Sequence, residues 1–374
     1  MAPLQCKQML IKRERGGTPT NKSQRDNTID ILKGIGIILM VIGHAGSPQL
    51  LHDYIYTFHM PLFFIASGYF FSVKSISNKL QFFIKKIKGI YKPFVLCSIL
   101  FLLLHNIFFK IGIINDMYGS VDGATSHLYS IKEIAYHAFL IFAKMDGYEG
   151  FLLGAYWFMR ALFLSSLILC FGTWVLNIIF KSAEKSIFTL AILCLITGGI
   201  IKYTHIHIPF IAQGGYREMV GVFFMSVGFF MRKYKEFLSK NSFVLIVCII
   251  VSFALFIIHP ASIEMKSGFV DWMIIPFSGI SGTYVIYYLS QRWNKSNVII
   301  SYMGQKSLWI LTLHLLVFKL SELLEIYIYD LPIQMIGCHT IIPPIDNCFF
   351  ILHTVVAVSV PTFIAYVMTT KREA

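Results

Sequence analysis

A lysine and a histidine lie eleven positions apart in the first long apolar segment, Ile29–Gly46. In an α-helix eleven steps exceed three turns by about 20°, so Lys33 and His44 share a face, about 16 Å apart along the axis. Asp30, one turn earlier, is placed to orient Lys33. Histidine titrates near neutrality, as a general base must, and ionisable groups buried in apolar segments are usually functional. The alternative is a snorkelling lysine and a histidine hydrogen-bonded inside a helix bundle.

Two other histidines within apolar segments are further candidates for the site. His59 precedes Pro61 in the second segment, where the proline removes a backbone donor and either kinks a helix or begins one. His314 lies in the middle of the ninth segment. Each is either a core histidine whose hydrogen bonds are formed inside the bundle or a residue that lines a site shared with His44.

Two arginines also lie within or at the end of apolar segments. Trp157 and Arg160 are one helical turn apart in the fourth segment, and Arg217 lies near the outer end of the sixth. A guanidinium keeps its proton, so in a membrane it requires an anion or a polar cavity. That anion is either a buried acid in a structural ion pair or a group of the substrate.

The elements that must position these residues are membrane helices. Of all residues, 56% are hydrophobic and 14% are charged, whereas soluble proteins carry about 25% charged residues. A span needs around 20 apolar residues. The sequence predicts an all-α, polytopic transmembrane bundle of about ten helices, at Ile29–Gly46, Tyr54–Phe71, Pro93–Ile111, Phe151–Phe180, Ser186–Ile201, Gly214–Met231, Ser242–His259, Phe269–Ser290, Ser307–Ile328 and Cys348–Met368.

Two stretches fit this pattern less well. Ser186–Ile201 is short for a span, and Glu133–Ala143 is a short apolar stretch that suits an outer amphipathic or re-entrant piece.

The basic residues predict the orientation. With both termini in the cytoplasm, the inner segments hold 23 Lys and Arg and the outer loops hold 3, which is the positive-inside pattern of an inner (plasma) membrane protein. The net charge of +13 therefore reflects loops rather than a nucleic-acid surface. Residues 1–28 lack the apolar run of a signal peptide and are expected to form a disordered basic cytoplasmic tail, followed by a membrane domain at 29–370 and a short cytoplasmic end at 371–374.

The cysteines indicate no metal centre. No CxxC motif or His/Cys cluster occurs among the seven cysteines, so we expect no bound metal. Cys338 and Cys348 fall in one outer loop, where a disulfide is one possible arrangement.

The first segment resembles the opening helix of the membrane acyltransferase-3 family, in which a basic residue, ten further residues and a histidine recur. Phe58–Phe70 resembles the family block F-H-x-P-x-F-F-x-x-S-G-x-F. The chain departs from the family where Lys33 replaces the commoner arginine and Leu311 replaces an aromatic residue. Further matches, which extend the resemblance over about residues 26–368, are Tyr156-Trp157-Phe158 with Ala161-Leu162-Phe163, Phe223-Phe224 with Gly228, and Gly304-x-x-Ser307-Leu308 before His314.

The resemblance implies O-acylation of a carbohydrate or lipid-linked glycan by acetyl-CoA, and the subgroup most similar resembles fucose 4-O-acetylase. Acetyl-CoA would be a co-substrate that approaches from the cytoplasm. The roles expected are catalysis by His44 and His59, donor binding by Lys33, Asp30, Lys85 and Lys86, and substrate binding by Trp157, Arg160, Arg217 and His314.

Two other function classes stay open. A carrier that exports a glycan or lipid-linked substrate would use the same buried polar groups, although no internal repeat is visible in the sequence. A non-catalytic membrane scaffold would tolerate the loss of His44.

Overall fold

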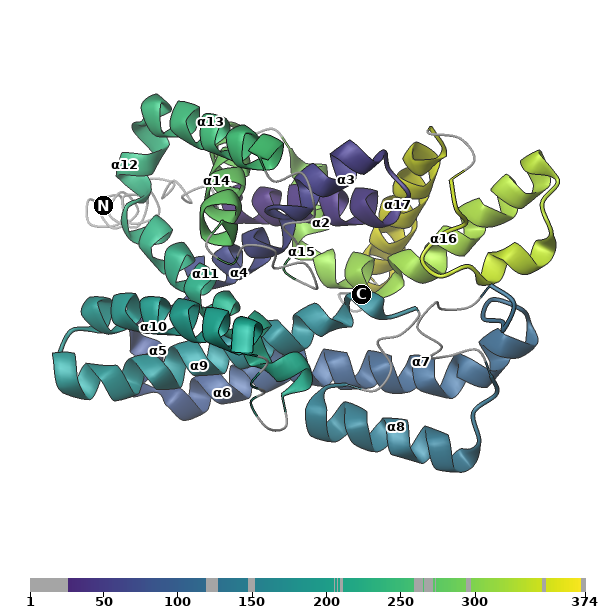
Figure 1. Ribbon diagram of the computed structural model, residues 1–374, viewed down its shortest axis with the longest axis horizontal. Helices are drawn as coiled ribbons and strands as arrows, with labels where there is room; N and C mark the ends of the chain where they lie inside the picture. The colour runs from purple at the N-terminus through teal and green to yellow at the C-terminus, as the bar shows by residue number, and fades with distance from the viewer. Residues whose placement is uncertain are drawn as a thin grey trace, which may run out of the picture.

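The computed structural model describes residues 26–118, 127–146, 152–204, 206, 208, 211–258, 265, 272, 274–293, 297–344 and 348–370. Regular structure in these residues is helical (Figure 1), as expected for an all-α chain. In chain order the elements are α2 (Thr28–His44), α3 (Gln49–Tyr56), α4 (His59–Tyr69), α5 (Lys74–Ser77), α6 (Lys79–Lys86), the π-helix η1 (Ile87–Tyr91), α7 (Lys92–Lys110), α8 (Ile131–Lys144), η2 (Gly154–Tyr156), α9 (Trp157–Phe180), α10 (Ala183–Thr204), η3 (Ala212–Gly215), α11 (Tyr216–Lys233), α12 (Lys235–Lys240), α13 (Ser242–Ile258), α14 (Ile275–Trp293), α15 (Val298–Gln305), α16 (Ser307–Tyr329), η4 (Ile333–Gly337) and α17 (Phe349–Thr370).

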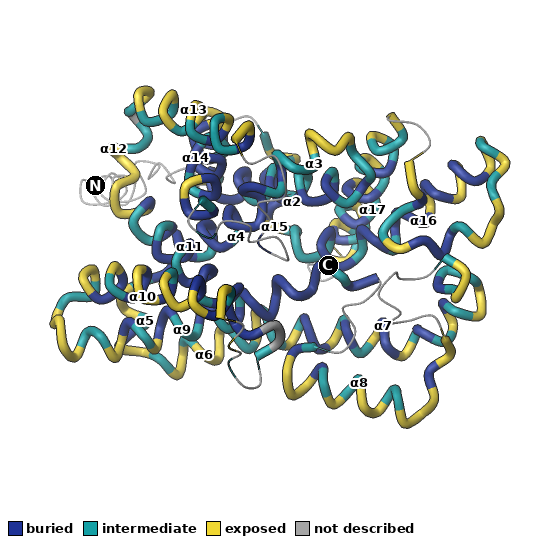
Figure 2. Tube along the Cα trace, viewed as in Figure 1, coloured by how far each residue is buried: buried dark blue, intermediate teal, exposed yellow. Residues whose placement is uncertain are grey.

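Helix α2 lies at the centre of the bundle. It packs against α4, α14, α15, α16 and α17, and most of its residues are buried, as the dark blue in Figure 2 shows. The outer helices α6, α8 and α13 are mostly exposed or intermediate. Protein rather than lipid therefore surrounds α2, which allows it to carry Asp30 and Lys33.

Five stretches of the described residues are long and apolar enough to cross a membrane, which identifies a membrane protein. Helix α13 is apolar but shorter, with 17 residues. The count of about ten spans and the side of each terminus stay predictions. The five stretches are Lys79–Lys110, Gly154–Phe180, Ala183–Thr204, Ser307–Tyr329 and Phe349–Thr370.

The prediction of one continuous helix over Tyr54–Phe71 is wrong. Helix α3 ends at Tyr56, and α4 begins at His59. The Thr57 hydroxyl donates to the Tyr54 carbonyl at 2.7 Å and closes the turn between them. Pro61 lies in the first turn of α4, where a missing backbone N–H costs nothing. The break places His59, which is buried, at a helix start rather than inside a span.

The two stretches that fitted less well have different outcomes. Helix α10 has 22 residues, which is long enough for a span. Helix α8 has 14 residues, about 21 Å, and its capping box at Ser130 and Glu133 fixes where it begins. It packs on α7 as a short outer helix beside the bundle.

Cys338 and Cys348 carry thiols rather than a disulfide.

Two glycines allow α4 and α11 to pack at backbone distance. A Cβ on Gly68 would overlap the Met225 carbonyl oxygen, and a Cβ on Gly228 would overlap the Ile65 carbonyl oxygen. This reciprocal contact is the small-residue packing typical of membrane helices. It seats α4, and with it His59, against the rest of the bundle.

Gly68→Ala and Gly228→Ala should each lower the melting temperature of the detergent-solubilised protein. Forcing atoms into a packed contact costs about 1–3 kcal/mol, whereas alanine in a helix is otherwise favoured by up to about 1 kcal/mol. The control is Gly89→Ala, because nothing lies within 4 Å of its added Cβ. Thermal unfolding of all three variants should separate the first two from the control; equal melting temperatures would contradict the contact.

Candidate functional site

A cavity of about 500 Å³ lies within the bundle, and Lys33 and His44 both line it. The shared face predicted for these residues is therefore confirmed, and the cavity follows α2 between them. Its walls come from α2, α3, α4, η1, η2, α9 and α16, with single contributions from Phe70, Met265 and Thr340. Its polar and aromatic lining residues include Lys33, His44, His52, Tyr56, His59, Ser67, Trp157, Ser307 and Thr340.

One end of the cavity carries a cation. The Nζ of Lys33 lies 2.9 Å from a carboxylate oxygen of Asp30, and the lysine side chain is 26% exposed. This ion pair, predicted from the spacing, orients the lysine without burying it fully. Lys85 and Lys86 are not among the described residues that line the cavity. Gly89 and Ile90, about one turn later, are.

His44 lies against His314 of α16. Its Nδ1 is 3.0 Å from Nε2 of His314, and the two ring planes are within 12° of parallel, with 5.2 Å between centroids. Nδ1 of His314 lies 3.1 and 3.0 Å from the carbonyl oxygens of Ile310 and Leu311, so this nitrogen carries a proton and donates. Nε2 of His314 is then an acceptor, and Nδ1 of His44 must donate to it. Nε2 of His44 therefore holds the lone pair that a general base needs.

His59 lines the same cavity and is held in the same way. Its Nδ1 donates to the Ile55 carbonyl at 3.0 Å, which leaves the lone pair on Nε2. The ring lies 4.7 Å from that of Tyr56, and Tyr56 stacks on His52 at 4.0 Å. The His44 end of the cavity is therefore lined by imidazole and phenol rings, and Nδ1 of His52 lies 3.0 Å from a carboxylate oxygen of Asp53.

Trp157 lines the cavity, whereas Arg160 and Arg217 lie behind it. The Arg217 guanidinium lies 4.8 Å from the centre of the Trp157 ring, a cation–π contact. Arg160 lies 3.8 Å from both Glu218 and Asp146. Both arginines are 2% exposed. The structural ion pair left open from the sequence is thus present at Arg160, and Arg217 supports the indole.

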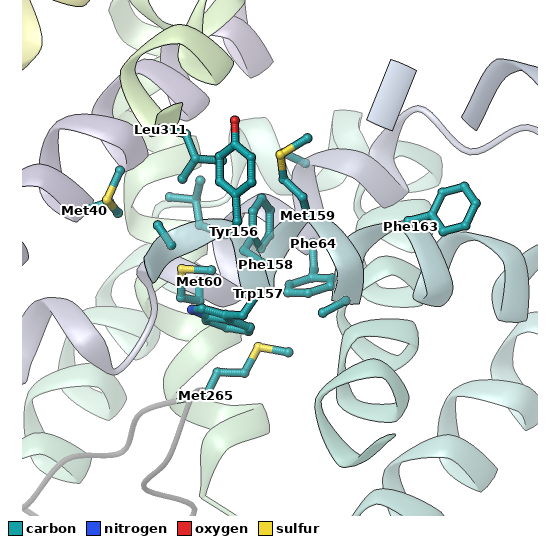
Figure 3. Close-up of a cluster of buried hydrophobic side chains, with 14 of the residues drawn as sticks. Met40, Met60, Phe64, Tyr156, Trp157, Phe158, Met159, Phe163, Met265 and Leu311 are labelled. Carbon is teal, nitrogen blue, oxygen red and sulfur yellow. The ribbon is translucent and has the colours of Figure 1, made fainter. Parts of the chain in front are cut away.

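The middle of the cavity is apolar. Figure 3 shows the Trp157 indole beside Met60 and Met265, with Met40 and Leu311 across the space. All of these residues line the cavity. Beside them, Tyr156 donates to the Thr312 hydroxyl at 2.7 Å, and Thr312 donates to the Leu308 carbonyl, which ties the start of α9 to α16. An uncharged chain therefore fits between Lys33 and His44.

Sequence reasoning missed three parts of this arrangement. It predicted that His314 binds substrate, and it did not foresee that His314 contacts His44. It also did not place His52, Tyr56 or Thr340 at the cavity. It also passed over Lys319, whose spacing with Glu322 and Glu325 in an apolar span was a usable signal.

The arrangement suits transfer of a group between two hydroxyl-like or thiol-like atoms. A neutral base lies about 16 Å from a cation along α2, with an apolar passage between them. Such a site fits a donor with an anionic end and a long uncharged arm that reaches the base. Among the described residues no three side chains gather as metal ligands.

Comparison with known proteins agrees with this chemistry. No curated protein and no solved structure matches the chain. Residues 26–369 match the family model described as an acyltransferase domain. That match includes the helices that carry Lys33, His44, His59 and His314, so it covers the whole site. The chain belongs to the acyltransferase-3 family.

Proposed function

We propose that this membrane acyltransferase moves an acetyl or similar acyl group from cytoplasmic acetyl-CoA to a hydroxyl of a carbohydrate or cell-surface glycan. The observation that carries the proposal is that His44, whose Nδ1 contacts the buried His314, lines the same cavity as Lys33. The family supplies the reaction class. The donor and the acceptor are inferred from the shape and polarity of the cavity and from the resemblance of the sequence motifs.

His44 acts as the general base. Its Nε2 takes the proton of the acceptor hydroxyl while the hydroxyl oxygen attacks the thioester carbonyl. The imidazolium formed keeps its Nδ1–H bond to His314, which fixes the ring in the productive orientation. When the carbon–sulfur bond breaks, His44 returns the proton to the thiolate, so an ester and a thiol leave with no net proton change. His59, with its own lone pair on Nε2, orients the acceptor.

Lys33 binds the anionic end of the donor. A phosphate of CoA at Lys33 places the pantetheine arm along the apolar passage and the thioester near His44. Asp30 holds the lysine in place at 2.9 Å. Lys85 and Lys86 lie outside the lining, so their contribution is long-range attraction to the donor's phosphates.

Trp157 contacts the acceptor directly, since aromatic rings stack on the apolar faces of sugars. Arg217 and Arg160 act through Trp157 and its surroundings rather than by touching the acceptor. The charge distribution supports cytoplasmic termini, an inner-membrane location and an acceptor presented from the outer side.

His44→Gln should lower kcat for acetyl transfer by about 10²–10⁴-fold, the usual contribution of a general base. His314→Gln should lower kcat by about 10–100-fold, as expected for a residue that orients a catalytic group. The measurement is transfer from labelled acetyl-CoA to glycans in membranes.

The control for both variants is His105→Gln. His105 is fully buried in α7 but does not line the cavity, so transfer should persist. Unchanged transfer in His44→Gln would refute the mechanism. Transport of a glycan without any ester formation would favour a carrier.

Lys33→Gln should raise the apparent KM for acetyl-CoA about 10- to 150-fold, because a charge-assisted phosphate contact contributes roughly 1.5–3 kcal/mol. Lys85→Gln and Lys86→Gln should raise it less, and their effect should vanish at high salt. Initial rates at varied donor concentration test this. An effect of Lys33→Gln on the acceptor KM alone would contradict the assignment.

The orientation can be tested with thiols. Cys348 is exposed at the start of α17 and should react with a membrane-impermeant maleimide in intact cells. Lys181→Cys, between α9 and α10, should react only after lysis when made in a Cys348→Ser background. The reverse labelling pattern would place the termini outside.

A further inference from the structure

The loop between α16 and α17 closes on the end of α2. We define it as the outer loop, Leu331–Pro344. A Cβ added at Gly46, two residues after His44, would overlap the Ile341 side chain, so this side chain packs directly on the glycine backbone. The next residue back, Thr340, lines the cavity. The outer loop therefore brings a hydroxyl to the same cavity as the proposed base.

Thr340 occupies an unusual backbone conformation. Its φ is 65°, in the left-handed region that β-branched residues rarely adopt. Glycine or asparagine would adopt it with less strain. Non-glycine residues held in this region cluster at functional sites, where the surroundings fix them in place. The side chain is half-buried, and its hydroxyl lies 3.1 Å from Nδ1 of His339.

A buried ion pair on α16 is hydrogen-bonded to the backbone of the outer loop. Lys319 of α16 is 4% exposed, and its Nζ lies 3.0 Å from a carboxylate oxygen of Glu322. The same ammonium donates to the Cys338 carbonyl at 2.8 Å. This bond joins the helix to the backbone two residues before Thr340. Burying an ion pair costs desolvation free energy. The bond from Lys319 to the loop carbonyl is a structural contribution that the buried pair makes.

Further hydrogen bonds fix α16, which holds the outer loop, and join the loop to the segment after α7. His353 of α17 links Ser321 at 2.7 Å and Glu325 at 3.2 Å, and all three side chains are buried. Asn115, after α7, donates to the Gln334 carbonyl at 2.7 Å. The loop is thus bonded to α16 and to the segment after α7, and α16 is bonded to α17; these contacts keep Thr340 in place despite its strained backbone.

We propose that Thr340 is an acceptor-binding residue and that Lys319 is a positioning residue that holds it at the cavity. The proposal rests on the proposed function, because it presumes an acceptor beside His44. The Thr340 hydroxyl, which both donates and accepts, hydrogen-bonds a second hydroxyl of a polyhydroxylated, uncharged acceptor. Around it, Tyr56 and His59 offer neutral hydrogen-bonding groups, and Nδ1 of His52 lies 3.0 Å from a carboxylate oxygen of Asp53.

Thr340→Val keeps the shape and the β-branch but removes the hydroxyl. With L-fucose as the probe acceptor, the apparent acceptor KM should rise about three- to tenfold, the equivalent of one neutral hydrogen bond. Thr340→Ser keeps the hydroxyl and should stay within about twofold of the wild type. The dissociation constant of labelled CoA should be the same in both. An unchanged acceptor KM in Thr340→Val, or a changed donor affinity, would overturn the assignment.

Lys319 requires a test that separates position from stability. Lys319→Met leaves Glu322 buried without its lysine and should destabilise the protein as well as raise the acceptor KM. The double variant Lys319→Met/Glu322→Leu removes the whole pair, so thermal stability should recover. The acceptor KM should stay raised, because the Cys338 carbonyl still lacks its anchor. A normal acceptor KM in the stable double variant would show a purely structural role.

A labelling experiment gives a readout that needs no turnover. In a Cys348→Ser background, Thr340→Cys should react with an impermeant maleimide, and L-fucose should slow that reaction. A thiol that is inert, or that fucose does not protect, would overturn the loop assignment. If the wild type acetylates neither fucose nor any membrane glycan, the proposed function itself fails. Wild-type transfer with unaffected loop variants refutes only the present inference.

Discussion

The ionisable side chains that this bundle removes from water need partners inside it, and the arrangement of the central helices depends on that constraint. His44 of α2 is paired with His314 of α16. Arg160 of α9 lies against Glu218 of α11. Each pair joins two helices that are far apart in the chain. The bundle is therefore held in register by polar contacts at a few points, while apolar side chains supply most of the packing.

Helix α16 contacts both the proposed base on α2 and the outer loop. His314 and Lys319 are five residues apart, so they face different directions, about 140° apart around the helix. One reaches His44, and the other reaches the carbonyl of Cys338. A shift of α16 would disturb both contacts together. One helix therefore supports both the proposed base on α2 and the proposed acceptor-binding residue on the outer loop, and precise sites are usually supported by such rigid elements.

The sequence was sufficient for features that depend on local spacing. Helical periodicity placed Lys33 and His44 on one face, and block length located most of the helices, because both follow from the geometry of a single helix. It was insufficient where distant segments meet. The tautomers of His44 and His314 depend on a contact across 270 residues of chain. The break before His59 depends on a threonine hydroxyl at a turn, and the φ of Thr340 depends on the anchors of its loop.

The apolar middle of the cavity also concerns the permeability of the membrane. A passage with Lys33 near one end and imidazole groups near the other would conduct protons if water filled it. Ile37, Met40 and Leu311 line the stretch between, and narrow passages lined by such side chains exclude water and ions. The stretch proposed to accept the donor's uncharged arm would by the same property oppose the entry of water. Under the proposed function, these side chains would both admit the donor and limit proton leakage across the membrane.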